Sequence, residues 1–307
     1  MKKLVIVSSV VTVILLVLAT FFDLQIDEYI YNPKSSFAKI FATLGMLPQN
    51  ALLFLAPAMA FSAMFEKRRE VKTPVWILII AALLLVTIVD FRDTAIFLQD
   101  ASKLPYSAVI PIICFVIFAL FLAALPFAKK KPNELLITAL IGLAAFTVGY
   151  FILQTLKTYW GRQRFFTMND SAEQFTKWYL PQEKSVSDNF KSFPSGHSFN
   201  AMCAVWFALW PLFIDGLKKY TKLIFTLALL FGFATMASRM IYGRHFLSDV
   251  TVGAAIALAS FALATMFFSH ARQRPPAGLH ARLCQKSRQT IGDRVYSRER
   301  RRQAWNS

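Results

Sequence analysis

Three short motifs, far apart in the chain, contain the residue types best suited to chemistry. The motif residues are Lys157 and Arg164, then Pro194, Ser195, Gly196 and His197, then Arg239, His245 and Asp249. Together they supply three cations, a turn that can offer backbone N–H groups, and two histidines, one of them close in sequence to a carboxylate. These groups suffice to bind a phosphate ester and cleave it by nucleophilic attack.

His245 and Asp249 are four residues apart at the start of an apolar stretch, and on a helix that spacing places two side chains on one face. A carboxylate that accepts a hydrogen bond from one imidazole nitrogen fixes the tautomer and leaves the other nitrogen free to attack. Arg239 lies six residues before His245, and a guanidinium can hold two phosphate oxygens. Taken alone, the pair is equally explained by a helix cap, and the arginine by contact with lipid headgroups.

The other two motifs also have simpler explanations when each is taken alone. If the helix that carries Lys157 continues, Arg164 lies on the same face, whereas Gly161 would end that helix sooner. Two basic residues after a membrane span are ordinary snorkelling anchors. The tetrapeptide at 194–197 is a turn before a helix, whose N–H groups can bind phosphate, and His197 can donate a proton to a leaving group. By itself it also fits a plain turn with an exposed histidine.

The composition predicts a membrane protein. The 307 residues are 56% hydrophobic and include 30 Phe, and the mean hydropathy is +0.47. Uncharged runs that approach about 20 residues are typical of membrane-spanning helices. We therefore expect an all-α, polytopic integral membrane bundle of about eight spans, the first acting as a retained signal anchor. The expected spans are roughly 4–22, 50–65, 75–89, 106–127, 135–156, 198–214, 221–237 and 250–269.

The formal net charge of +17 is distributed along the chain in a way that fits this topology. Lysines and arginines gather in alternating short loops, at 2–3, 67–72, 129–131 and 218–222. This positive-inside pattern predicts that both termini are cytoplasmic and that anionic lipids, rather than nucleic acid, are the partners. The loops at 23–49, 157–197 and 238–249 would then share the outer side, which brings all three motifs to one face.

The expected domains follow from the same pattern. Residues 1–134 would form four N-terminal membrane helices and residues 135–269 a catalytic core, whereas residues 270–307 would be a basic, disordered cytoplasmic tail. The three cysteines, Cys114, Cys203 and Cys284, give no disulfide framework. Neither a zinc-type spacing nor a carboxylate cluster is present, so we expect no metal or other cofactor.

The motifs resemble those of the type 2 phosphatidic acid phosphatase superfamily, which includes membrane lipid phosphate phosphatases and soluble vanadium haloperoxidases. The family pattern is K-x6-R-P, then P-S-G-H, then S-R-x5-H-x3-D. This chain is similar at every position except Phe165, where proline is usual. The motif-bearing resemblance covers roughly residues 135–269. A core of six membrane helices is common in the family, so a count of eight departs from it.

The resemblance implies a role for each motif residue. His245 would be the nucleophile that forms a phosphohistidine, Asp249 would orient it, and His197 would be the general acid. The phosphoryl oxygens would be bound by Lys157, Arg164, Arg239, Ser195 and the Gly196 N–H. Arg162 and Arg244 flank the motif positions and are expected at most to touch a headgroup.

The expected function is hydrolysis of a lipid phosphate or pyrophosphate at the outer face of a bacterial cytoplasmic membrane. Undecaprenyl pyrophosphate, phosphatidylglycerophosphate, phosphatidic acid and lipid A phosphates all fit. Two alternatives stay open: a phosphotransferase that passes the phosphoryl group to another lipid, and a non-catalytic lipid-phosphate binder or transporter. A haloperoxidase fits the motifs but not a site that faces lipid.

Overall fold

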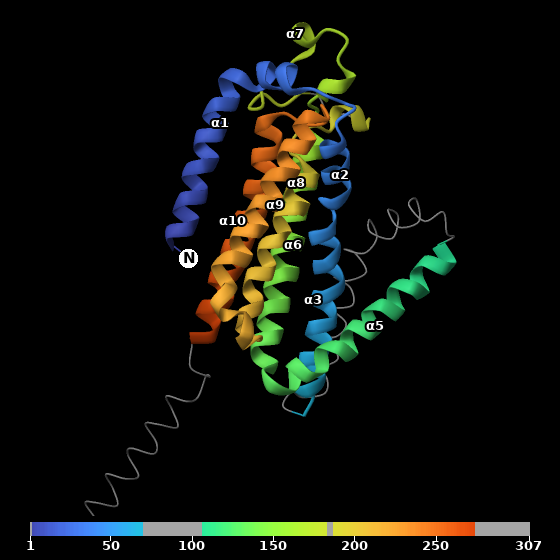
Figure 1. Cartoon of the computed structure of the whole chain (residues 1–307), viewed down its shortest axis with the longest axis vertical. Helices are drawn as coiled ribbons and strands as arrows, with labels where there is room; N and C mark the ends of the chain where they lie inside the picture. Colours follow the sequence, from blue (N-terminus) through green and yellow to red (C-terminus); the bar gives the residue numbers. More distant parts are fainter. Residues whose placement is uncertain (1, 70–105, 183–186, 274–307) are drawn as a thin grey trace, which may run out of the picture. The chain divides into compact units, whose positions relative to one another are not determined.

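In the computed structural model of the chain, residues 2–69, 106–182 and 187–273 are described, and their regular structure is helical throughout (Figure 1). The α-helices are α1 (Lys2–Ile30), α2 (Ser36–Leu44), α3 (Leu47–Glu66), α5 (Tyr106–Lys130), α6 (Pro132–Trp160), α7 (Ser171–Gln174), α8 (Gly196–Met202), α9 (Thr221–Ile241) and α10 (Leu247–Gln273). The 3-10 helices are η1 (Phe165–Thr167), η2 (Asp188–Phe190), η3 (Cys203–Leu212) and η4 (Asp215–Tyr220). The expected span at 75–89 lies outside the described residues.

Long apolar helices confirm the predicted helical membrane bundle. Among the described residues, five helical segments are long and apolar enough to cross a membrane: Ile6–Ile30, Ser36–Glu66, Pro132–Thr167, Asp215–Ile241 and Leu247–His270. A further apolar helix, α5, covers the expected span at 106–127 and ends on Lys129 and Lys130. The chain is therefore an all-α protein of the membrane class.

The expected span at 198–214 differs from a single continuous α-helix. Its first residues form α8, and the chain then tightens into the ten residues of η3. The Trp206 side chain is fully buried, and its indole N–H donates to the Thr138 carbonyl of α6 across 2.9 Å. Gly142 leaves room for this indole, because a Cβ there would lie 2.6 Å from the Trp206 Nε1. Small residues that admit a neighbour closely are typical of helix contacts in membranes.

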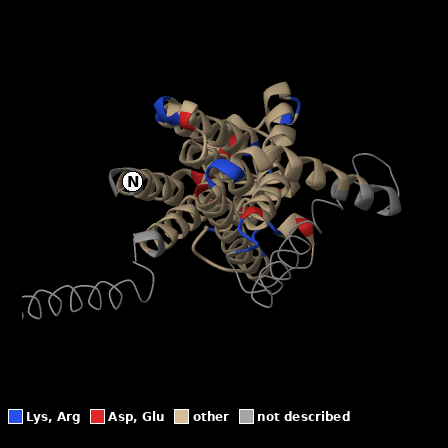
Figure 2. Cartoon of the chain, turned by 90° about the horizontal axis from the view of Figure 1, so that it is seen from below, with Lys and Arg blue, Asp and Glu red and all other residues tan. Residues whose placement is uncertain are grey.

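Basic residues mark one end of the bundle. Asp215, at the start of η4, pairs with Lys131 and with Lys218, both across 2.7 Å, so two of the predicted positive loops lie together. Figure 2 shows the lysines and arginines in short stretches among helices that are otherwise mostly uncharged. Since α6 starts at this end and carries Lys157 near its other end, its 29 residues separate the two regions by about 40 Å.

The first helix is longer than the predicted span, and its extra turns matter for the site. The sequence predicted a span over 4–22 and an outer loop from 23, whereas α1 continues to Ile30. Figure 1 shows α1 bending, so that its last turns cross the end of the bundle near α7. Asp23 and Asp27 lie on these turns, and both are buried, 2% and 0% exposed.

The first turns of α10 approach the backbone of the second motif closely. The Ser195 N–H donates to the Asp249 carbonyl across 2.9 Å. One turn later is Gly253, where an added Cβ would lie only 2.2 Å from the Ser195 carbonyl oxygen. Because backbone atoms cannot rotate away as a flexible side chain does, this contact requires glycine.

We therefore expect Gly253→Ala to push α10 away from Ser195, to lower the free energy of unfolding by about 1–3 kcal/mol and to reduce any activity of the site. Thermal unfolding of the purified chain in detergent measures the first effect. Gly216→Ala is the matched control, since a Cβ at Gly216 meets no atom within 4 Å. Equal effects of the two substitutions would contradict the close-contact explanation.

Candidate active site

Backbone hydrogen bonds join the segments that carry the three motifs. The Ser192 N–H donates to the Arg162 carbonyl across 3.0 Å, and the Phe166 N–H donates to the Gly243 carbonyl across 3.0 Å. The bond from Ser195 to Asp249 ties the second motif to the third. The structure therefore brings together, at one end of the bundle, residues that are up to 92 positions apart between Lys157 and Asp249.

Gly161 ends α6 and decides how the first motif is arranged. It adopts a left-handed conformation, φ 64°, directly after Trp160. Lys157 therefore lies on the helix, whereas Arg164 follows it on an extended segment, so the two cations do not share one helix face. The Lys157 ammonium donates to the carbonyls of Lys191 and Pro194, both across 3.0 Å.

The two arginines of the predicted phosphate site differ in their partners. The Arg164 guanidinium forms an ion pair with Asp188 across 3.0 Å, and the Asp188 side chain is 73% exposed. Arg239 is 6% exposed, its Nε has no hydrogen-bond partner, and no carboxylate among the described residues pairs with it. A buried guanidinium without a counter-charge is costly unless an anion binds to it.

His197 is the second residue of α8, directly after the helix begins. Ser195 caps this helix, because its hydroxyl oxygen accepts from the Ser198 N–H across 3.4 Å; the same oxygen accepts from the Ser198 hydroxyl across 3.0 Å, and Ser195 is fully buried. Burial lowers the pKa of His197 well below its usual value, and the charges of Arg239, Lys157 and Arg164 lower it further. The imidazole is therefore neutral when no anion occupies the site.

The tautomer of His245 is fixed by a backbone carbonyl. Its Nδ1 lies 2.6 Å from the Ser192 carbonyl oxygen, and since a carbonyl only accepts, Nδ1 carries the hydrogen and Nε2 is left bare. His245 is 2% exposed. Burial lowers its pKa well below the usual value, and Lys157, Arg239 and Arg164 lower it further. The three cations thus act on both histidines.

Asp249 does not take the position that its spacing from His245 predicts. Since α10 begins at Leu247, His245 lies outside the helix, and its Nδ1 is 3.9 Å from Asp249 Oδ2, too far for a hydrogen bond. That oxygen accepts from the Phe246 N–H across 2.9 Å and from the Ser192 hydroxyl across 2.5 Å. Asp249 is the third residue of α10, and its carboxylate accepts the backbone N–H of Phe246, the residue before the helix. This arrangement is a helix cap.

Sequence reasoning missed three residues of this site, namely Arg162, Ser192 and Asp23. Arg162, expected at most to touch a headgroup, is fully buried and pairs with Asp249 across 2.6 Å and with Asp23 across 2.9 Å. An available signal was the pair Asp23 and Asp27, four residues apart in an apolar helix. No comparable signal marks Ser192, because its contacts depend on the folded loop.

Phe165, which stands where the family pattern has proline, contacts aromatic rings from other segments. It lies edge-on to Tyr31, with ring centroids 5.2 Å apart, and to Phe246 at 6.2 Å. Tyr31 directly follows α1. Phe165, in the position of the usual proline, therefore forms another contact between the first motif and the N-terminal part of the chain. The Phe246 ring also lies 4.2 Å from the Arg162 guanidinium.

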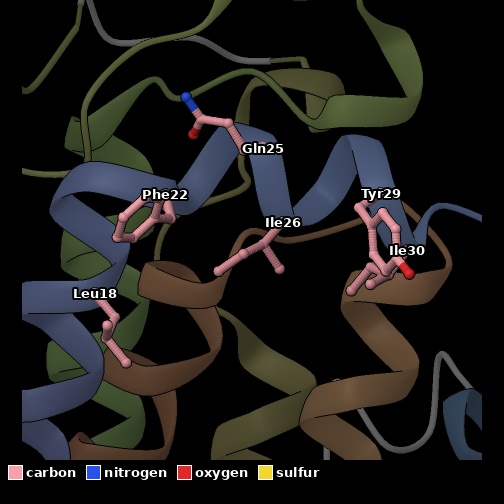
Figure 3. Close-up of a pocket in the computed structure, with 6 residues that line it drawn as sticks. All are labelled: Leu18, Phe22, Gln25, Ile26, Tyr29 and Ile30. Carbon is pink, nitrogen blue, oxygen red and sulfur yellow. The ribbon is translucent and has the colours of Figure 1, made fainter.

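An apolar groove of about 400 Å³ lies along α1 and is lined by residues other than the buried Asp23 and Asp27 (Figure 3). Its lining consists of Leu18, Phe22, Gln25, Ile26, Tyr29 and Ile30, and Gln25 points away from the other five. Since no motif residue lines it, we assign the chemistry to the buried polar cluster and not to this groove.

The comparison with known families agrees with the motifs. The family model described as the PAP2 superfamily matches residues 135–273. The match confirms the predicted resemblance, and the matched segment contains all three motifs. Of the helices in the described part of the chain, α1, α2, α3 and α5 precede it. No curated protein matches the chain.

The two lowered pKa values predict that the protein loses stability in acid. An unfolded histidine binds a proton near pH 6.5, whereas folded His197 and His245 resist it, so stability is complete above about pH 6.5 and falls below it. Each histidine contributes up to about 1.4 kcal/mol per pH unit until its folded pKa is reached.

Unfolding midpoints of the detergent-solubilised chain between about pH 7.5 and about pH 5 measure this loss. His245→Gln should reduce the acid dependence, and the exposed His270→Gln should leave it unchanged. The same acid dependence in all three proteins would contradict the assignment of the loss to the buried histidines.

Proposed function

We propose that this chain, a member of the PAP2 superfamily through residues 135–273, hydrolyses a lipid phosphate or pyrophosphate by way of a phosphohistidine at His245. The family match supports phosphatase activity on phosphate esters. The observation that carries the proposal is a neutral imidazole with an unprotonated Nε2, whose pKa is lowered by burial and further by the charges of three cations. A neutral imidazole with an unprotonated nitrogen is a nucleophile, and the three cations would bind the phosphate oxygens.

The proposed first step transfers the phosphoryl group to His245. Its Nε2 attacks phosphorus, the bond to the leaving oxygen breaks, and His197 donates a proton to that oxygen. His197 is neutral in the free site, because burial and then the charges of Arg239 and Lys157 lower its pKa. A bound phosphate offsets those charges, so substrate binding itself raises the His197 pKa toward the acid form.

The proposed second step hydrolyses the intermediate. His197, now neutral, accepts a proton from a water molecule, and the resulting hydroxide attacks phosphorus and releases His245. The equatorial oxygens carry the transition-state charge, which Lys157, Arg164 and Arg239 would stabilise. This role for the three cations is the reason to propose a reaction that needs no metal ion.

Substrate would compete with Asp188 for Arg164 and would give Arg239 its missing counter-charge. Ser195 and the Gly196 N–H complete the proposed phosphate site. Because Asp188 is mostly exposed, its replacement by phosphate costs little desolvation.

A lipid substrate and an outward-facing site are supported by the bundle. The apolar helices fit contact with membrane lipids, and the motif residues lie at the end of α6 opposite the basic cluster around Lys131 and Lys218. Under the positive-inside rule the basic end is cytoplasmic, so the site would open on the exterior face of a cytoplasmic membrane.

We predict that the purified chain releases inorganic phosphate from lipid phosphates in detergent with a chelator present. His245→Ala should lower kcat by at least about 10³-fold, because it removes the nucleophile. The matched control is His270→Ala, at an exposed position of α10. A panel of phosphatidic acid, a lipid pyrophosphate and a water-soluble monoester would show which leaving group the site prefers.

Full activity in His245→Ala would contradict the proposed nucleophile. If labelled phosphate leaves the donor lipid but appears in a second lipid, the chain is a transferase that uses the same intermediate. If lipid phosphate binds without turnover in the unmodified chain, the hydrolase proposal fails and a binding function replaces it.

A further inference from the structure

The N-terminus of α10 depends on a residue from another helix. The residue before the helix is Phe246, whose side chain cannot cap the first free N–H groups. Asp249 accepts the Phe246 N–H across 2.9 Å. The Ser248 N–H instead donates to Asp23 Oδ1 of α1, also across 2.9 Å. The start of α10 is therefore capped by one carboxylate of its own and one that is 225 positions away.

Arg162 links the carboxylates of Asp23 and Asp249, and it binds each one through a different terminal nitrogen of its guanidinium. Nη2 donates to Asp23 Oδ2 across 2.9 Å, and Nη1 donates to Asp249 Oδ1 across 2.6 Å. All three residues are at most 2% exposed. Buried charged hydrogen bonds are short and strong, and the loss of one partner leaves an uncompensated charge in the interior. The Asp249 carboxylate therefore cannot move independently of Asp23.

From Asp249 the chain of contacts reaches the imidazole in two ways. Ser192 donates its hydroxyl hydrogen to Asp249 and offers its carbonyl to His245 Nδ1. In addition, His245 directly precedes Phe246, whose N–H the Asp249 carboxylate accepts. A shift of Asp249 would thus change both the backbone before α10 and the hydrogen bond that fixes the tautomer of His245.

We infer that Asp23, on α1 and outside the segment that matches the family, is a positioning residue of the catalytic centre that acts through Arg162 and Asp249 on His245. The inference rests on the proposed function for its effect on turnover. Asp23 does not touch the reacting atoms. Its role is to keep the bare Nε2 of His245 aimed at the phosphate site.

Two other contacts of α1 provide controls, since they join α1 to the outer loop without touching this network. The Trp178 indole donates to the Thr20 hydroxyl across 3.1 Å, and the Ser171 hydroxyl donates to Glu28 across 2.6 Å. If α1 served only as an anchor for the loop, loss of the Glu28 contact and loss of the Asp23 contact would have similar consequences.

The test compares Asp23→Asn with Glu28→Ala, which removes the acceptor of the Ser171 hydroxyl, in the full-length chain with phosphatidic acid in detergent micelles as substrate. We expect Asp23→Asn to lower kcat by about 10²-fold, because a small displacement of the nucleophile costs that much. KM should change by less than about threefold, since the phosphate-binding cations are unchanged. Glu28→Ala should keep the kcat of the unmodified chain.

A second measurement tests the pathway of the effect. Arg162→Lys retains the charge but cannot hold two carboxylates in one planar fork. If Asp23 acts through Arg162, the double variant should be no slower than Arg162→Lys alone. Fully additive losses in kcat would overturn the pathway that we infer.

The third measurement does not need turnover. Side-chain ¹⁵N NMR of the four histidines reports which nitrogen carries the hydrogen. His245 should be protonated at Nδ1 in the unmodified chain and should become a mixture of tautomers in Asp23→Asn. If this change occurs but the unmodified chain releases no phosphate, the proposed function fails while the positioning role stands. If Asp23→Asn lowers stability but changes neither kcat nor the His245 resonances, the inference is wrong.

Discussion

The first turn of α10 is the constraint on which the candidate site depends. A helix that starts in a buried place must satisfy its free N–H groups, and here the acceptors are the carboxylates of Asp249 and Asp23. His245 directly precedes Phe246, whose N–H is capped by Asp249. The contacts that satisfy the free N–H groups of α10 therefore also position the proposed nucleophile. Gly253 allows the same helix to approach Ser195, which brings the second motif to the first turn.

Buried charge is the second constraint, and the site handles its cations in different ways. Arg162 is neutralised by two carboxylates and so is structural. Arg164 has an exposed partner that a substrate can replace, and Arg239 has none among the described residues. These differences in pairing are the reason to propose that Arg162 stabilises the fold, whereas Arg164 and Arg239 bind the phosphate.

The sequence was sufficient to predict the helical membrane bundle and the resemblance to the PAP2 superfamily, because long apolar runs and spaced polar residues are local signals. It also left open whether Gly161 would end α6, and the left-handed conformation at Gly161 gives the answer. The sequence could not show that His245 and Asp249 lack a direct hydrogen bond, because a spacing of four residues fits both a shared helix face and a helix cap. Asp23 was missed because a carboxylate on an apolar helix acquires its role only from partners that fold against it.

The central claim is that His245 carries the phosphoryl group. The most direct measurement is a rapid base-quenched reaction of the full-length chain with a lipid whose phosphate is ³²P-labelled, followed by peptide mapping at alkaline pH. The account predicts a covalent label that is stable in base, labile in acid and confined to the peptide containing His245. Rapid phosphate release with no covalent label, or a label on another residue, would contradict it.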